Sequence, residues 1–200
     1  MKIGILGAGT VGRSFARAVL PLGHTVMLSS RSPHSDEMRQ LARELGSPVG
    51  TVAETIAFGD LIALALRWDA VPDAVAQGDW DGKILVDMTN RFGGGSGQSA
   101  AQDLARLAPG AQVVKAFNTL GAEHYTHPVF GGQAATLLIA GDSPDAKHVV
   151  RQLAEAMGFD VADAGDLAAS SHLEALAALW VHLAMRAGYG RQIAFRLLRG

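Results

Sequence analysis

The chain has 200 residues, of which 48% are hydrophobic and 18% charged, and its formal net charge at pH 7 is −2. This composition fits one compact globular domain with a small extension, and the charge provides no basic surface for nucleic acid or an anionic membrane. Cysteine is absent, which excludes disulfides, thiolate metal sites and cysteine nucleophiles. Glycines and Arg13 interrupt the apolar first 20 residues, and other apolar runs are far shorter than the roughly 20 residues of a membrane span. We therefore expect a soluble, cytoplasmic protein.

Short runs rich in β-branched residues and leucine alternate with longer helical patterns along the chain. Because strands covered by helices on both faces are apolar throughout, this alternation predicts βαβ units and a parallel sheet. The predicted strands are residues 2–6, 24–28, 60–66, 83–87, 112–116, 135–140 and 159–163. The predicted helices are residues 11–22, 34–45, 68–77, 99–107 and 143–157. The expected fold class is α/β, with a Rossmann-type, doubly wound and mostly parallel sheet.

A last helix is predicted at residues 167–187. Apolar side chains such as Leu173, Leu176, Leu179 and Trp180 lie on nearly all of its sides, so it must be buried against the body of the fold or a second subunit. We divide the chain into a Rossmann-type domain, residues 1–165, and a C-terminal helical extension, residues 166–200. This extension would form part of a substrate pocket or a dimer contact, and a homodimer is the expected assembly.

A glycine-rich turn follows the first predicted strand and opens the first predicted helix. In this position Gly7 allows a tight turn, Gly9 lets the backbone approach a dinucleotide pyrophosphate, and Gly12 permits close packing of helix on strand. Thr10 and Val11 would present free backbone N–H groups at the positive end of the helix dipole. A glycine turn without a ligand is the less favoured interpretation. The turn predicts a dinucleotide-binding site.

The residues after the second strand indicate which dinucleotide binds. An NAD site usually places a carboxylate here to bind the ribose hydroxyls, whereas this chain has Ser30, Arg31 and Ser32. These side chains could hydrogen-bond a 2′-phosphate, with the Arg31 guanidinium adding a charge-assisted contact. The alternative is a polar loop in which Ser32 caps a helix that Pro33 begins. The pattern favours NADP(H) over NAD(H).

Ligands of open α/β sheets collect at the carboxyl ends of the strands. The residues found there that could contact the nicotinamide half of the cofactor are Leu66, Arg67, Thr89, Asn90 and Asn118. Arg67 and Arg91 could also meet a phosphate or an acidic substrate. Ordinary loop capping is the alternative for each residue taken singly.

No catalytic residue and no metal ligand is assigned. The chain lacks the Tyr-x-x-x-Lys arrangement that would polarise a carbonyl, although Lys115 or a histidine could still donate a proton. Glu123, His124 and His127 have a spacing that suggests a metal, but no clear third ligand accompanies the histidines, and a surface or pocket-lining role is favoured.

Several of these segments together resemble one family. Residues 7–12, Ser30-Arg31, Asp87-x-Thr89-Asn90 and residues 114–119 occur in this order, followed by residues 140–142 and 157–167. The chain is similar over nearly its whole length to the coenzyme F-420-dependent NADP reductases. That resemblance implies NADP(H) as cofactor and coenzyme F-420 as a possible co-substrate. The chain departs from the family at Arg67 and Arg91, where the family often has proline.

Three functions stay open on this basis. The leading one is an oxidoreductase that transfers a hydride between NADPH and a deazaflavin or flavin-like acceptor, for which close stacking of two rings is needed more than a protein acid or base. The second is an NADPH-dependent reductase of a small carbonyl, imine or ferric substrate. The third is a non-catalytic NADP(H) sensor, because the assigned residues bind cofactor and none performs chemistry.

Overall fold

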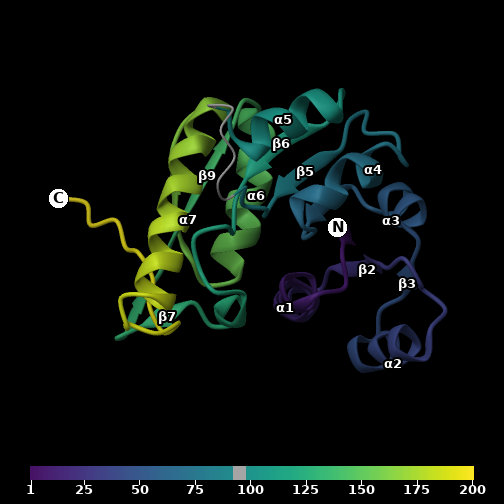
Figure 1. Ribbon diagram of the computed structural model, residues 1–200, viewed down its shortest axis with the longest axis horizontal. Coiled ribbons are helices and arrows are strands. Elements are labelled where there is room, and N and C mark those ends of the chain that lie inside the picture. Colours follow the sequence, from purple (N-terminus) through teal and green to yellow (C-terminus); the bar gives the residue numbers. More distant parts are fainter. Residues whose placement is uncertain (92–97) are drawn as a thin grey trace.

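The structure is a computed structural model of the chain, and it describes residues 1–91 and 98–200 (Figure 1). The strands of its main sheet are β1 (Lys2–Leu6), β2 (Thr25–Ser29), β3 (Val49–Gly50), β4 (Leu61–Leu64), β5 (Ile84–Asp87), β6 (Gln112–Lys115), β9 (Thr136–Gly141) and β10 (Asp160–Asp163). The α-helices are α1 (Thr10–Val19), α2 (Asp36–Leu45), α3 (Val52–Phe58), α4 (Val71–Val75), α5 (Ala100–Leu107), α6 (Pro144–Ala156) and α7 (Ser170–Met185).

The main sheet has the strand order β10-β9-β6-β5-β4-β1-β2-β3. Its six strands from β3 to β6 are parallel and in the Rossmann order. The strand order reverses between β1 and β4, so a ligand crevice is expected outside their carboxyl ends. β9 is antiparallel to β6, and β10 is parallel to β9. The predicted α/β, doubly wound, mostly parallel fold is confirmed.

Helices cover both faces of the sheet. Apolar side chains of α1, α2 and α6, including Phe15, Leu41 and Val150, pack on one face with Ile3 and Ile5 of β1. Side chains of α3, α4 and α5 pack on the other face with those of β4 and β5. This double covering explains why the central strands are apolar on both sides, and it leaves the strand ends as the places where polar groups gather.

Two elements near residue 50 were absent from the sequence-based prediction. β3 has only two residues, too few to give a periodic signal. α3 begins with a capping box, in which the Thr51 hydroxyl accepts the Glu54 N–H and the Glu54 carboxylate accepts the Thr51 N–H. A short hairpin of β7 (Val129–Phe130) and β8 (Gln133–Ala134) was also not predicted.

Two of the predicted helices have different bounds in the structure. α2 begins after Ser35, whose hydroxyl accepts the Met38 N–H, so the alternative in which Ser32 caps this helix is wrong. Ser32 instead donates its N–H to the Ser30 hydroxyl. The helix expected over residues 68–77 consists of a 3-10 turn, η2 (Trp68–Ala70), followed by the short α4.

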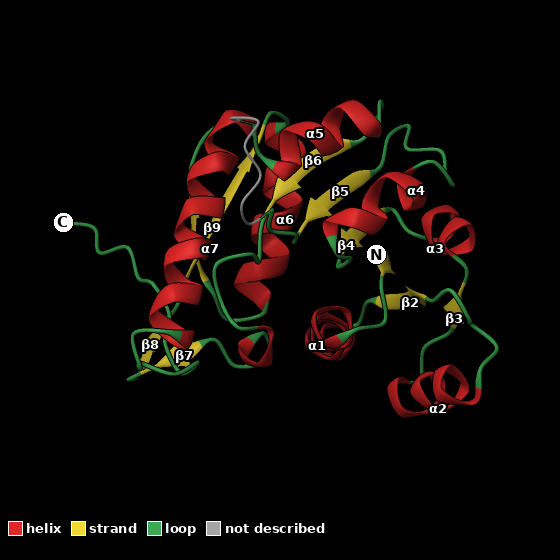
Figure 2. Ribbon diagram, viewed as in Figure 1, coloured by secondary structure: helices red, strands yellow, loops and turns green. Residues whose placement is uncertain are grey.

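The C-terminal helix α7 lies beside β9 (Figure 2). Leu173, Ala177, Trp180 and Ala184 of α7 are buried, whereas Leu179, Val181 and Met185 are exposed. One face of α7 is therefore buried against the body of the fold, as predicted, and a second subunit over the other face stays a prediction. Residues 167–185 are long and apolar enough for a membrane span, but the buried side chains show that this helix packs on the fold.

Candidate functional site

The glycine turn has the geometry of a nucleotide-binding loop. Gly7 has a φ of 112°, which only glycine adopts readily, and a Cβ there would lie 2.6 Å from the Ala65 carbonyl oxygen of the neighbouring strand end. A Cβ on Gly12 would lie 2.0 Å from the Gly7 carbonyl oxygen. A Cβ on Gly9 would meet no atom within 4 Å. Gly7 and Gly12 are thus required by the fold, whereas the space over Gly9 is open.

The open space lies at the N-terminus of α1. Gly9 is the N-cap residue, no side chain caps this terminus, and the first turn contains no acidic residue. The helix dipole and the first N–H groups, including those of Thr10 and Val11, therefore favour an anion. Thr10 is exposed and Val11 half-buried at this end. A pyrophosphate group fits the arrangement.

The end of β2 lies directly beside the glycine turn, because the buried Ser29 hydroxyl accepts the Gly7 N–H at 3.0 Å. Ser30, Arg31 and Ser32 follow. Within the described part of the chain Arg31 is exposed and makes no hydrogen bond or ion pair. The three residues named from the sequence are thus held next to the turn, with the Arg31 guanidinium available to a ligand.

Arg13 connects the glycine turn to the start of α2, and it was not among the site residues predicted from the sequence. Its Nε donates to the Ala8 carbonyl at 2.6 Å, and its Nη2 lies 2.6 Å from Oε1 of Glu37 in the first turn of α2. A basic residue directly after the third glycine, with an acidic residue early in the second helix, was the available signal.

The two arginines that depart from the family pattern have different surroundings. The side chain of Arg67 is 88% exposed, next to the half-buried Leu66, and pairs with Asp69. Arg91 stacks over Trp68 with its Cζ 5.0 Å from the ring centroid, and it pairs with Asp103 at 2.5 Å. Arg91 is therefore engaged within the fold, whereas Arg67 faces solvent, and a ligand contact of either arginine stays a prediction.

The polar residues after β5 and β6 do come together. The side-chain amide of Asn118 donates to Asn90 Oδ1 at 3.0 Å and to the Leu173 carbonyl of α7 at 3.0 Å, and Asn90 donates to the Asn118 carbonyl. Thr89 is buried and donates to Asp87 through both its N–H and its hydroxyl. Among the described atoms, buried Asn118 Oδ1 lacks a hydrogen-bond partner. The hydrogen-bonded pair of Asn90 and Asn118 thus forms a polar platform at the carboxyl edge of the sheet.

A buried charge cluster supports this platform. Lys115 and Asp87 are both fully buried, with Nζ 2.9 Å from Asp87 Oδ2. Lys115 also donates to the Thr89 carbonyl and lies 3.3 Å from Glu174 Oε1 of α7. The Lys115 ammonium thus has three acceptors, which satisfy its buried charge.

The turn between Lys115 and Asn118 contains an unusual backbone conformation. Phe117 has a φ of 59°, a left-handed value that costs a non-glycine residue about 1–2 kcal/mol. Its ring is buried against Phe15, Tyr125 and Phe159, and the Tyr125 hydroxyl donates to the Phe117 carbonyl at 2.6 Å. Burial raises the pKa of Tyr125, which keeps this hydroxyl a donor. These contacts hold the strained residue in place and direct Asn118 toward Asn90.

The 3-10 turn with Glu123 and His124 binds the C-terminal segment through Arg191. Arg191 binds both carboxylate oxygens of Glu123, at 2.6 and 2.8 Å, and lowers the pKa of that carboxyl. His124 contacts the Arg191 carbonyl through Nε2. The described residues contain no group of three or more histidine, aspartate and glutamate side chains that could hold a metal ion.

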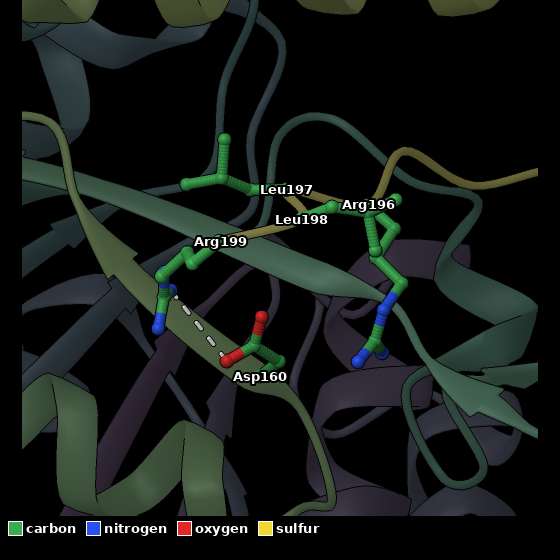
Figure 3. A pocket seen from close by; sticks show the side chains of 5 residues that line it. All are labelled: Asp160, Arg196, Leu197, Leu198 and Arg199. Atoms are coloured by element: carbon green, nitrogen blue, oxygen red, sulfur yellow. Dashed lines mark ion pairs between the residues drawn. The ribbon is translucent and has the colours of Figure 1, made fainter.

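A hollow at the outer edge of the sheet is separate from the glycine turn. Figure 3 shows it where the last residues pass the start of β10; its volume is about 240 Å³ and it is lined by Asp160 and residues 196–199. Arg199 pairs with Asp160 across it at 3.6 Å. No candidate cofactor residue lines this hollow.

The comparison with known families agrees with the fold and the glycine turn. Residues 2–91, from β1 to Arg91 after β5, match the family model described as NADP oxidoreductase, coenzyme F-420-dependent. The chain carries a domain of this family. The predicted resemblance is confirmed over these residues.

Individual relatives differ in what their names describe. The chain is 35% identical over 179 residues to the metalloreductase STEAP3 of Rattus norvegicus, covering 88% of this chain and 36% of the relative. The chain thus spans about a third of the length of the curated relatives it matches. A putative F-420-dependent NADP reductase from Arthrobacter sp. FB24 has 28% identity and a TM-score of 0.88, with all of both chains covered. A reductive aminase from Aspergillus terreus, solved with NADPH, has 27% identity and a TM-score of 0.72, over 94% of this chain and 63% of the other.

Proposed function

We propose that this chain binds NADPH across the carboxyl edge of its sheet and exchanges a hydride with a deazaflavin or flavin-like acceptor. The observation that carries the proposal is the uncapped N-terminus of α1 with open space over Gly9, beside a second-strand end that has Arg31 in place of a carboxylate. A site of that kind suits a pyrophosphate followed by a phosphorylated ribose.

The chain's residues fit the cofactor at three places. The N–H groups of Thr10 and Val11 would bind the pyrophosphate, and Ser30, Arg31 and Ser32 would bind the 2′-phosphate. Leu66, Arg67, Thr89, Asn90 and Asn118 remain the candidates for the nicotinamide half. Of these, Asn90 and Asn118 are already oriented by their mutual hydrogen bonds, so they could position a ring with little loss of side-chain entropy.

Bound NADPH would supply the hydride from its nicotinamide ring, and any proton that the reduced acceptor needs would come from bulk solvent. The role of the chain would be to hold the two rings in contact and to exclude water from between them. Lys115 keeps the loop that carries Thr89 and Asn90 against β6 and α7 through its contacts with the Thr89 carbonyl and Glu174. We assign no residue to proton transfer.

The choice of a deazaflavin acceptor is supported by the Arthrobacter structure, because the similarity covers all of both chains. Exposed Arg67, next to the candidate nicotinamide residues, would suit an acidic acceptor. A ferric acceptor is the second candidate, favoured by the 35% identity to a metalloreductase. An imine acceptor is favoured by the similarity to the reductive aminase.

Anaerobic mixing of the purified chain with NADPH and one acceptor at a time tests the proposal. The nicotinamide absorbance should fall with coenzyme F-420 and stay constant without an acceptor. Oxidation with ferric citrate or with a cyclic imine, and none with coenzyme F-420, would replace the leading candidate by the corresponding alternative. NADPH binding without oxidation by any acceptor would favour an NADP(H) sensor.

A further inference from the structure

We propose that Arg13 is a specificity-determining residue for the 2′-phosphate of NADP(H), and that Glu37 occupies its guanidinium until the nucleotide binds. The inference rests on the proposed NADPH site and deepens it. It concerns a side chain that the glycine motif does not include.

The Arg13 guanidinium is held at the glycine turn. Arg13 lies on the first turn of α1, and its Nε donates to the carbonyl of Ala8, between Gly7 and Gly9. Gly7 in turn donates its N–H to Ser29 at the end of β2. Because the adenosine ribose of a Rossmann cofactor lies at the end of the second strand, these two contacts bring the guanidinium to the side of the glycine turn where the 2′-phosphate would lie.

The partner of Arg13 is Glu37, in an ion pair that is largely exposed on the Glu37 side. Nη2 lies 2.6 Å from Glu37 Oε1, and the Glu37 side chain is 72% exposed whereas that of Arg13 is 29% exposed. An ion pair with such an exposed carboxylate contributes little stability, about 0–1 kcal/mol. The Nε contact fixes the base of the guanidinium, and the outer nitrogens can exchange a solvated carboxylate for a phosphate.

The charges near the end of β2 favour a phosphate. Besides Arg13 of α1, Arg31 after β2 provides a second cation there, and it is exposed. A 2′-phosphate carries more charge than one carboxylate and can accept from both guanidinium groups, so it would compete successfully with Glu37 for Arg13. Glu37 would meanwhile disfavour the phosphate, which makes it an opposing residue in the same specificity site.

Dissociation constants of NADPH and NADH, measured by nucleotide fluorescence on the purified chain, test the inference. For Arg13→Gln we expect NADPH binding to weaken about tenfold or more, the loss of a charged hydrogen bond, with a much smaller loss for NADH. For Glu37→Gln we expect NADPH to bind roughly two- to fivefold more tightly, with NADH unchanged. Arg17→Gln and Glu44→Gln make the same charge changes on exposed positions of the same two helices and should leave the NADPH:NADH ratio unchanged.

The small probes adenosine 2′,5′-bisphosphate and 5′-AMP separate this role from pyrophosphate binding. Only the bisphosphate should respond to Arg13→Gln. Equal losses for both probes, or an unchanged ratio in Glu37→Gln, would overturn the inference. If Arg13→Gln unfolds, Glu37→Gln alone tests the inference with folded protein, because it should raise the affinity for NADPH and leave that for NADH unchanged. Wild-type protein that binds neither dinucleotide would refute the proposed function itself, whereas wild-type binding with an unaltered ratio in the variants refutes only the role of Arg13.

Discussion

Lys115 Nζ lies 2.9 Å from Asp87 Oδ2, and neither side chain has any exposed surface. The pair joins the carboxyl ends of β5 and β6, and Glu174 extends it to α7. A buried ammonium is tolerated only when its charge and its donors are satisfied. The carboxyl edge of the sheet and the C-terminal helix are therefore parts of one polar cluster.

Lys115→Met should lower the free energy of unfolding by about 3–5 kcal/mol, because it leaves Asp87 buried without its cation. Urea unfolding followed by circular dichroism measures this change. Arg39→Met, which removes an exposed ion pair with Asp36, is the control and should cost about 1 kcal/mol or less. A loss in Lys115→Met as small as that of the control would contradict the importance of the cluster.

Gly9→Ala and Gly12→Ala should separate ligand binding from folding. The Cβ of Ala at position 9 meets no protein atom, so the melting temperature should change little, while NADPH should bind about tenfold or more weakly because the methyl group takes up space needed by the pyrophosphate. The Cβ at position 12 would clash with the Gly7 carbonyl, so stability should fall as well. Thermal unfolding and NADPH titration of both variants check this. Unaltered NADPH affinity in Gly9→Ala would show that the pyrophosphate does not lie over this residue.

Arg31→Ala should weaken binding of NADPH much more than that of NADH, by about 1.5–3 kcal/mol for a lost charged hydrogen bond. Fluorescence titration with both nucleotides is the measurement. His34→Ala, three residues along the same loop and also exposed, is the matched control. Equal losses for NADPH and NADH would remove the basis for NADP preference.

The Glu123–Arg191 pair should make stability depend on acidity. Hydrogen bonds from Arg191 lower the pKa of Glu123 below its ordinary value of 4.5, so the pair contributes stability that is fully present above that pH and is lost as pH falls through the lowered pKa. Wild-type protein should therefore be more stable than Glu123→Gln near neutral pH, with the difference vanishing in strong acid. Unfolding curves at several pH values test this. Glu155→Gln, at a looser pair with Arg151, is the control and should cost less stability near neutral pH.

Much of the fold follows from apolar periodicity and loop chemistry, which predicted the glycine turn and the apolar strands of the main sheet. The direction of β9 was not predicted, because an apolar run reads the same in a parallel and an antiparallel strand. β3 was too short to detect. The capping box of Thr51 and Glu54 was readable in the sequence, and attention to it would have predicted α3.

The candidate site was predictable where a sequence motif fixes the backbone conformation. It was not predictable where side chains form ion pairs between distant elements of the fold. Gly7, Gly9 and Gly12 follow one strand and so are placed by local geometry. The partner of Arg91 is Asp103, on a later helix, and that of Arg13 is Glu37, on the next helix. Pairings of this kind depend on how helices pack, so the residue types can be read from the sequence but their partners cannot.

Removal of α7, and with it the Glu174 carboxylate, would affect shortened versions of this protein. A fragment that ends before α7 would lose this charge, the hydrogen bond from Asn118 to Leu173, and the apolar cover that Leu173 and Trp180 provide. Lys115 would then face solvent on the side where the helix had been. Expression of the first 165 residues alone should therefore give a product of low solubility, with the carboxyl edge of the sheet disordered although every glycine of the turn is present.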